Sequence, residues 1–304
     1  MRKRKHVITP RKVAFDLSKS PLHWLPGDSF SSHMINGIHL LLPAGELWFC
    51  RVYNQALLYV TDEDLRQDVR AFIEQEAIHA RAHRHGEDWL KDKHGMDVTE
   101  YRARVDWLFR QLLGDQPLGY KLPASMEMRW LILRVGLIAG IEHFTGMLGD
   151  WCMNSTGWDD GDPVVADLFR WHLAEEVEHR AVAFELFEHL CKTKLGFYMS
   201  RQAIMAIVFP IFIYAISEGY RSLAEQDRQD KKSRRLSKAF LPVLLWELQK
   251  MGRKTDHVPT FTYLLRRTVL WLKPNFHPIT EGDTEQALAY LAQSPAALAG
   301  ESAA

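Results

Sequence analysis

The sequence predicts an all-α protein, and three observations support this fold class. Apolar segments of helical length recur along the 304 residues and are separated by short turns that are acidic or contain proline and glycine. No segment shows the sustained polar and apolar alternation, bounded by Asn-Gly or Asp-Gly, that is typical of β-hairpins. The motif Glu-x-x-His, whose two side chains share one helix face, begins at Glu76 and again at Glu176. We therefore expect helices in every ordered part of the chain.

The N-terminal residues 1–30 predict an irregular basic arm. The chain begins Met1-Arg-Lys-Arg-Lys, and prolines at positions 10, 21 and 26 disfavour a continuous helix. No long apolar stretch follows the basic start, so we expect no secretory signal. We expect this arm to be flexible and to lead into a short helix over residues 31–42.

The first predicted helical hairpin consists of two long segments, 44–60 and 65–90. An acidic turn that begins at Thr61 separates them and supplies a cap and negative charge for the second helix. Glu46 lies about fifteen residues before this turn and Glu76 about fifteen after it, which is ~22 Å along each helix at ~1.5 Å per residue. We therefore expect the two carboxylates to meet at the same height of an antiparallel pair.

The second predicted hairpin repeats this construction. Residues 98–113 predict a crossover helix that leads to it. The third and fourth bundle helices are expected over 123–149 and 163–191, with an acidic turn between them that ends in a proline. Glu142 and Glu176 lie at similar distances on either side of this turn, so their carboxylates should also meet.

The two hairpins together predict a dinuclear metal site in a four-helix bundle over residues 31–195. Ferritin-like bundles bind two ions with one glutamate from each of two helices and a Glu-x-x-His from each of the other two. One motif copy arises by chance in helices rich in Glu and His, whereas two copies with matched upstream glutamates favour a metal site. Four carboxylates buried without compensation would be very costly, so metal ions or protons must neutralise them. The predicted catalytic residues, which are also the predicted metal ligands, are Glu46, Glu76, His79, Glu142, Glu176 and His179.

The motif suggests a role for each ligand. Glu76 and Glu176 are the carboxylates expected to bridge the two ions, and the two upstream glutamates are expected to bind from single helices. His79 and His179 should each bind one ion. Glu175 lies four residues before His179 and could replace Glu176. Superposing the two motifs nevertheless aligns Glu176 with Glu76, which favours Glu176.

Neighbouring side chains leave two questions open. His83 and His172 each lie four residues from a proposed ligand, and they either line the site or are ordinary hydrogen-bonded histidines. A metal-bound histidine usually donates its second N–H to a carboxylate or carbonyl oxygen. Glu175 or Asp150 could accept this hydrogen bond, and the sequence does not choose between them.

The chain changes character beyond the bundle, where residues 196–280 predict further helices that pack on it. Residues 203–216 are almost entirely apolar, but this run is shorter than the ~20 residues that span a bilayer, and it contains Pro210. We therefore favour a buried helix over an element that dips into a membrane. The surrounding Arg and Lys residues still permit peripheral contact with an anionic membrane. Residues 281–304 predict a short helix and a frayed alanine-rich tail.

Composition narrows the class of protein further. Lys plus Arg equals Asp plus Glu at 38 each, so no net charge attracts nucleic acid, and we expect no such partner. The three cysteines form no C-x-x-C motif and no secreted disulfide pattern, which favours the cytoplasm. No G-x-S-x-G elbow and no phosphate-binding glycine loop occurs. The sequence gives no information on the oligomeric state.

The predicted ligand set restricts the chemistry without choosing one reaction. Carboxylates with two imidazoles suit iron, manganese or zinc, and we favour iron. Fold analogy favours a di-iron oxidase or oxygenase that activates O₂ on a small, hydrophobic substrate. The alternative is a metal-dependent hydrolase, in which a hydroxide that bridges two ions attacks a small-molecule substrate. A second alternative is a metal-binding bundle without catalytic activity.

Five segments of the sequence together resemble a known family. They are Pro43-Ala44-Gly45-Glu46, Glu76-x-x-His79, Glu142-His143-Phe144, Glu176-x-x-His179 and Lys273-Pro274-Asn275-Phe276-His277-Pro278. In this order and at these intervals they resemble the bacterial family named predicted metal-dependent hydrolase, over roughly His33 to Pro278. The resemblance implies a ferritin-like, metal-binding helical core. Because the word hydrolase in that name is itself a prediction, it does not decide between oxygen and water activation.

Overall fold

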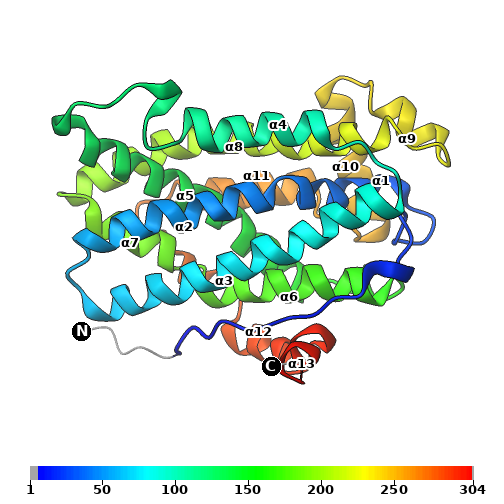
Figure 1. The fold of residues 1–304 in the computed structure, drawn as a ribbon, viewed down its shortest axis with the longest axis horizontal. Coiled ribbons are helices and arrows are strands. Elements are labelled where there is room, and N and C mark those ends of the chain that lie inside the picture. The colour runs from blue at the N-terminus through cyan, green and yellow to red at the C-terminus, as the bar shows by residue number, and fades with distance from the viewer. Residues whose placement is uncertain (1–5, 303–304) are drawn as a thin grey trace.

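A computed structural model describes residues 6–302, and all regular secondary structure in this range is helical, which confirms the all-α prediction (Figure 1). The basic residues at positions 1–5 lie outside the described range. The α-helices are α1 (Ser29–Asn36), α2 (Leu42–Ala56), α3 (Glu63–Asp88), α4 (Thr99–Trp107), α5 (Ala124–Met153), α6 (Pro163–His179), α7 (Val182–Leu190), α8 (Lys194–Ala224), α9 (Lys231–Leu236), α10 (Leu241–Thr255), α11 (Phe261–Trp271), α12 (Thr284–Leu291) and α13 (Pro295–Ser302).

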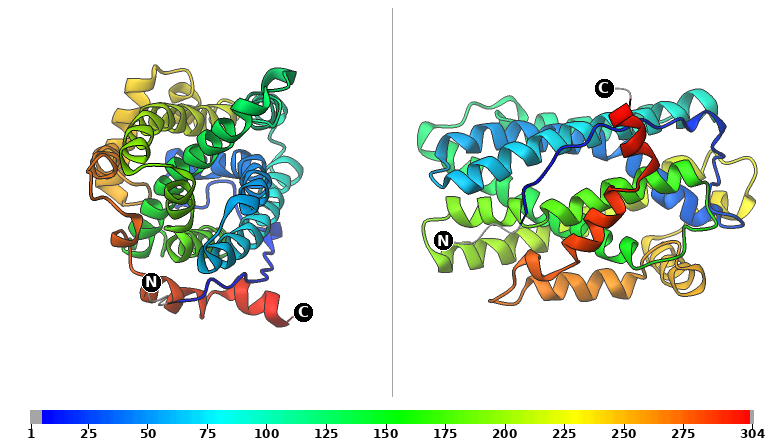
Figure 2. Two further views of the ribbon diagram at one scale, coloured as in Figure 1. Left: turned by 90° about the vertical axis from the view of Figure 1, so that its left-hand side faces the viewer. Right: turned by 90° about the horizontal axis from the view of Figure 1, so that it is seen from below.

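Four of these helices form the core of the molecule. Helix α2 packs against α3 and α5, and α6 packs against α5 and α3, so the four surround a common interior (Figure 2, left). The expected cap of the second helix is present, since the Asp62 carboxylate accepts from the Leu65 N–H at the start of α3. Asp162 caps α6 in the same way, with Pro163 at its first position. The two hairpins therefore form with the register that places the predicted ligands at matching heights.

The fourth predicted helix is not continuous, because α6 ends at His179 and α7 begins at Val182. The Arg180 guanidinium donates to the carbonyl of Val177, the acceptor that a continuing helix would use for residue 181. It also donates to the carbonyls of Pro278 and Ile279. The break thus exchanges helical hydrogen bonds for contacts with a distant segment, which the local sequence pattern did not predict.

Helices α8, α10 and α11 form a layer on the side of the bundle opposite α3 (Figure 2, left). Within the described residues, α5 and α8 are the two helices long and apolar enough to cross a membrane. In α5, 78% of the apolar window is buried inside the protein, whereas in α8 only 39% is buried. The prediction of a buried helix over 203–216 is therefore wrong for one side of α8. Its other side approaches the backbone at Gly37, where an added Cβ would lie 2.8 Å from the Gly219 carbonyl carbon.

The described parts of both terminal segments pack on the bundle, which corrects two expectations. The described part of the N-terminal arm has little helix, but it is not free, because its Ala14 N–H donates to the Ala296 carbonyl. The C-terminal tail is not frayed through residue 302, since α12 and α13 pack on α6. The Asp167 carboxylate of α6 accepts from the Ala296 N–H and from the Tyr290 hydroxyl. These buried hydrogen bonds hold the two ends together on one face.

Candidate metal centre

The structure brings all six predicted ligands together in the interior of the four core helices. Each of the four helices contributes from its inward face, and every one of these side chains is at most 2% exposed. Helix α2 supplies Glu46 and α5 supplies Glu142, while α3 and α6 each supply one Glu-x-x-His pair. The matching heights follow from the symmetric distances to the two turns.

The potential ligand atoms fall into two adjacent groups, each within 4.8 Å. In the first, His179 Nε2 lies 3.1 Å from a Glu176 oxygen, 3.2 Å from Glu142 and 3.3 Å from Glu76. The second contains Glu46, His79 and His172. Glu176 faces both groups, since its Oε1 is 2.7 Å from His172 Nε2 and its Oε2 is 3.1 Å from His179 Nε2. Two neighbouring cation positions that share one carboxylate are the arrangement expected of a dinuclear site.

Most of the converging atoms have no hydrogen-bond partner. Both carboxylate oxygens of Glu46, Glu76 and Glu142 lack one, and so does His79 Nδ1. A buried polar atom without a partner is costly, and a buried carboxylate is more so. Four glutamates carry four negative charges, which two divalent cations would neutralise. Oxygen-rich donors with imidazoles also suit such ions, so the residues present fit a pair of metal ions.

The electrostatics of the cluster reflect this crowding. The pKa values of Glu46, Glu76 and Glu142 are raised above the usual value for glutamate. Burial is the largest cause, and the neighbouring carboxylates are the second. Burial acts to lower the pKa of His79 and His179, but the surrounding carboxylates outweigh it, and both are raised. Without metal, the protein must therefore hold protons on groups that would otherwise bind the ions.

Each ligand histidine is oriented by a hydrogen bond on its outward side. His79 Nε2 is 2.9 Å from a Glu175 oxygen, which leaves Nδ1 facing the cluster. His179 uses the opposite nitrogen, since its Nδ1 is 2.9 Å from Gln75 Oε1 and its Nε2 faces inward. Glu175 is therefore the hydrogen-bond partner of His79, and Glu176 lies among the converging candidate ligand atoms. Asp150, the other candidate partner, instead forms an ion pair with Arg267.

The N-terminal arm reaches these outer contacts. Arg11 Nη1 lies 2.9 Å from Glu175 Oε1 and 2.7 Å from Glu178 Oε2. Glu178 also accepts from Gln75 Nε2 at 2.8 Å, and its other oxygen lies 2.5 Å from His6 Nε2. The expectation of a flexible arm is thus wrong for this segment, because two buried carboxylates need its positive charge. No local pattern in the sequence signals the contact.

His172 belongs to the cluster, which settles a question the sequence left open. Its Nε2 is 2.7 Å from Glu176 and 3.7 Å from Glu46, and its Nδ1 is 2.5 Å from His83 Nε2. His83 Nδ1 is in turn 2.8 Å from His39 Nδ1, so three buried imidazoles form a row. Burial lowers the pKa of His172 to about 4, so this imidazole is neutral near pH 7 and competent to bind metal. The available signal was its position four residues before Glu176.

A second His and Asp group lies away from the bundle centre and has a different character. Asp227 Oδ2 is 2.8 Å from His23 Nε2 and 2.9 Å from His33 Nε2. Its Oδ1 accepts from the backbone N–H of Gln229 and Asp230. Because both oxygens of this carboxylate already have hydrogen-bond partners, the group is accounted for as a link between the N-terminal segment and the end of α8.

We expect Gln75→Leu to weaken metal binding by about 10–100-fold, since outer partners of ligand histidines contribute this much. The substitution removes the acceptor that orients His179 and a donor to Glu178, with little change in volume. Metal affinity would be measured by competition with a chelating dye. Glu74→Gln, on the exposed face of the same helix, is the matched control. Equal affinity of the two variants would rule out an orienting role for Gln75.

Comparison with known proteins supports a metal-binding function. The model of a family described as predicted metal-dependent hydrolase matches residues 9–282, which include all six predicted ligands and His172. No curated protein and no solved structure matches the chain. The description supports metal dependence and gives no support to an iron-dependent oxidase. Since the match covers most of the 304 residues, the chain belongs to the predicted metal-dependent hydrolase family.

Proposed function

We propose that this protein is a hydrolase that uses two divalent metal ions held by the four core helices. The observation that carries the proposal is the group of buried carboxylate and imidazole atoms that face one another without hydrogen-bond partners. One ion would be held by Glu76, Glu142 and His179, the other by Glu46, His79 and His172, with Glu176 shared between them. We propose residues 31–195 as the metal-binding unit.

Bound divalent ions would supply a water molecule of lowered pKa and polarise the substrate oxygen. The chain's own side chains would orient the substrate and handle protons. Tyr53 is fully buried, and its hydroxyl has no hydrogen-bond partner. Its pKa is raised mainly by burial and to a smaller extent by the charges of Glu142 and Glu76. It therefore stays protonated and can donate a hydrogen bond at the site. Because its Nδ1 contacts His83, His172 would present Nε2 of a neutral imidazole to a metal ion.

The enclosure of the site limits its substrates. Because every proposed ligand is at most 2% exposed, only a small molecule reaches the site without movement of the surrounding side chains. The same observation favours one second candidate, an oxidase or oxygenase in which O₂ enters a dry helical interior. Iron would then be the metal, whereas zinc or manganese suits hydrolysis equally well.

Reconstitution with defined metals tests the proposal. The protein would be freed of metal, reloaded with Zn(II), Mn(II) or Fe(II), and supplied with small ester, amide and phosphoester probes with and without O₂. We expect probe cleavage that depends on Zn(II) or Mn(II) and is indifferent to O₂. The His79→Ala/His179→Ala double variant should lose both bound metal and cleavage.

Other outcomes contradict the proposal in distinguishable ways. Consumption of O₂ by the Fe(II) protein, with a new near-ultraviolet absorption band and no probe cleavage, would establish the oxygen-activating alternative. Two ions bound without either reaction would indicate a metal-binding bundle that is not catalytic.

A further inference from the structure

Helix α8 exposes an unbroken apolar stripe. Its exposed large or apolar side chains follow at intervals of three or four residues, which places them on one face. They are Leu195, Met199, Ala203, Ile207, Ile211 and Tyr214, and the exposed Ala206 and Pro210 lie between them. The stripe extends over ~28 Å at ~1.5 Å per residue, and no charged side chain is exposed between Leu195 and Ser217. A surface of this kind is far more apolar than the exterior of an ordinary soluble helix.

The two neighbouring helices of the same layer continue this apolar surface. On α10, Phe240 is 83% exposed at the start and Trp246 is 71% exposed. On α11, Leu265, Val269 and Leu272 are also exposed. The backbones of α8, α10 and α11 all lie on the side of the bundle opposite α3 (Figure 2, left), and these apolar side chains are exposed, so they belong to the outer surface of this layer.

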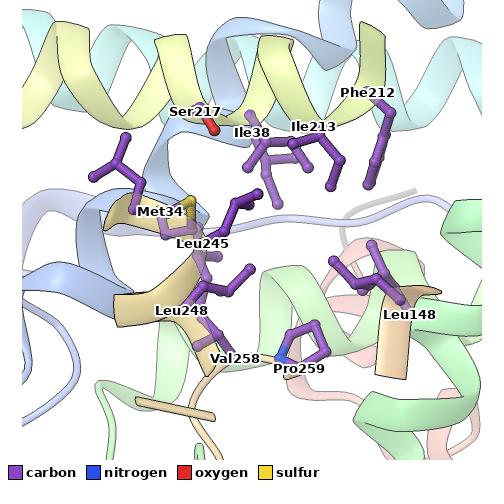
Figure 3. Close-up of a pocket in the computed structure, with 14 residues that line it drawn as sticks. Met34, Ile38, Leu148, Phe212, Ile213, Ser217, Leu245, Leu248, Val258 and Pro259 are labelled. Carbon is purple, nitrogen blue, oxygen red and sulfur yellow. The ribbon is translucent and has the colours of Figure 1, made fainter. Parts of the chain in front are cut away.

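An almost wholly apolar recess lies between α8, α10 and α11, and residues of α1 and α5 also line it. Its volume is about 60 Å³, and Ser217 is its one polar lining residue. Ile213 of α8 and Leu245 and Leu248 of α10 point into it (Figure 3). It lies between the α8 layer and helices α1 and α5, and none of the proposed metal ligands lines it. Its size suits the end of one hydrocarbon chain.

The charge of this layer is opposite to that of the rest of the protein. Residues 192–273 contain 16 Lys and Arg against 6 Asp and Glu, a net charge of +10. The whole chain is neutral, so the remainder carries −10. Of the charged side chains in 192–273, 13 basic and 2 acidic ones are exposed. Many of the basic ones cluster on α9 and at the end of α10, beside the exposed aromatic residues.

We propose that the face formed by α8, α10 and α11 docks on the surface of an anionic lipid bilayer. Apolar and aromatic side chains would enter the interface while lysines and arginines contact acidic headgroups. The charge of the face argues against a second copy of this chain as the occupant, because a two-fold interface would bring like-charged basic clusters together. Since α8 also packs on α5 and α1, it lies on the bilayer surface and does not span it.

The proposal does not depend on the reaction of the metal centre, and vesicle binding of the full-length protein tests it. We expect sedimentation with vesicles of phosphatidylcholine containing about 30% phosphatidylglycerol, and at least tenfold weaker binding to pure phosphatidylcholine. High salt should weaken binding to the anionic vesicles. The double variant Ile211→Glu/Trp246→Glu should reduce their binding at least tenfold.

Controls separate docking from loss of fold and from self-association. Leu58→Glu changes an 81% exposed leucine at the turn between α2 and α3, and it should bind vesicles as the parent does. All variants should keep the parent's helical circular dichroism and metal content. Equal binding to neutral and anionic vesicles, or unchanged binding of the double variant, would overturn the proposal. So would a dimer in light scattering that the double variant converts to monomer.

Discussion

Replacing Glu176 by glutamine is expected to lower bound metal from two ions to at most one per chain and to reduce metal-dependent activity at least 100-fold. Glu176 is the carboxylate whose two oxygens face the two groups of candidate ligand atoms, so its charge would serve both proposed ions. Loss of a hydrogen-bond partner of a metal ligand lowers metal affinity or activity about 10–100-fold, and loss of a shared ligand should lower it further. Elemental analysis and the reconstituted probe assay would measure the two effects.

The glutamine variant should fold, because it has the volume of glutamate and removes one negative charge from a crowded interior. Its helical circular dichroism should match that of the parent protein. Glu188→Gln, on the exposed face of α7, is the matched control and should retain two ions and full activity. Retention of two tightly bound ions by Glu176→Gln would show that Glu176 is not shared between them.

Removal of the metal is expected to make the stability of the protein fall as pH rises. Burial and neighbouring charges raise the pKa of Glu46, Glu76 and Glu142 in the folded protein. Each of these groups stabilises the fold fully below its unfolded pKa of ~4.3, and this stabilisation is lost as pH rises through the folded pKa. His79 and His179 act in the same direction, starting from an unfolded pKa of ~6.5.

Glu176 and three neighbouring histidines have the opposite sign. Burial lowers the pKa of His172 to about 4 and also lowers the pKa of His83 and His39, so their contributions to stability grow with pH and are complete above about pH 7. Burial acts to raise the pKa of Glu176, but the adjacent imidazoles outweigh it and hold the pKa well below its usual range. Its contribution is therefore complete above about pH 4.5 and lost at lower pH. Between pH 7 and pH 9 these opposing contributions no longer change, so the unfolding free energy of the metal-free protein should fall as pH rises.

Urea unfolding of the metal-free and metal-loaded proteins across this pH range would measure the difference. The loaded protein should not show the decline, because bound ions keep the carboxylates ionised and binding releases their protons. Metal affinity should accordingly rise with pH. A metal-free protein whose stability is constant or increases from pH 7 to pH 9 would contradict the assignment of these buried groups.

The apolar periodicity and the turns were sufficient to predict the core of this protein. Capping residues at the two hairpin turns set where α3 and α6 begin, and equal distances from the turns set the heights of Glu46, Glu76, Glu142 and Glu176. Helix geometry is local, so a count along the chain predicts which side chains meet across an antiparallel pair. The convergence of six ligands from four helices follows from that local rule.

The tertiary structure alone decided which further residues complete the site and which helix face stays uncovered. Arg11 reaches Glu175 and Glu178 from more than 160 positions away, and His172 enters the cluster because α2 and α3 present Glu46 and His79 to it. The end of α6 after His179 depends on contacts of Arg180 with a segment near residue 278. An apolar helix such as α8 has the same composition whether its outer face is covered or open. These features depend on long-range packing, and the sequence determined only the local helices and the register on which that packing is built.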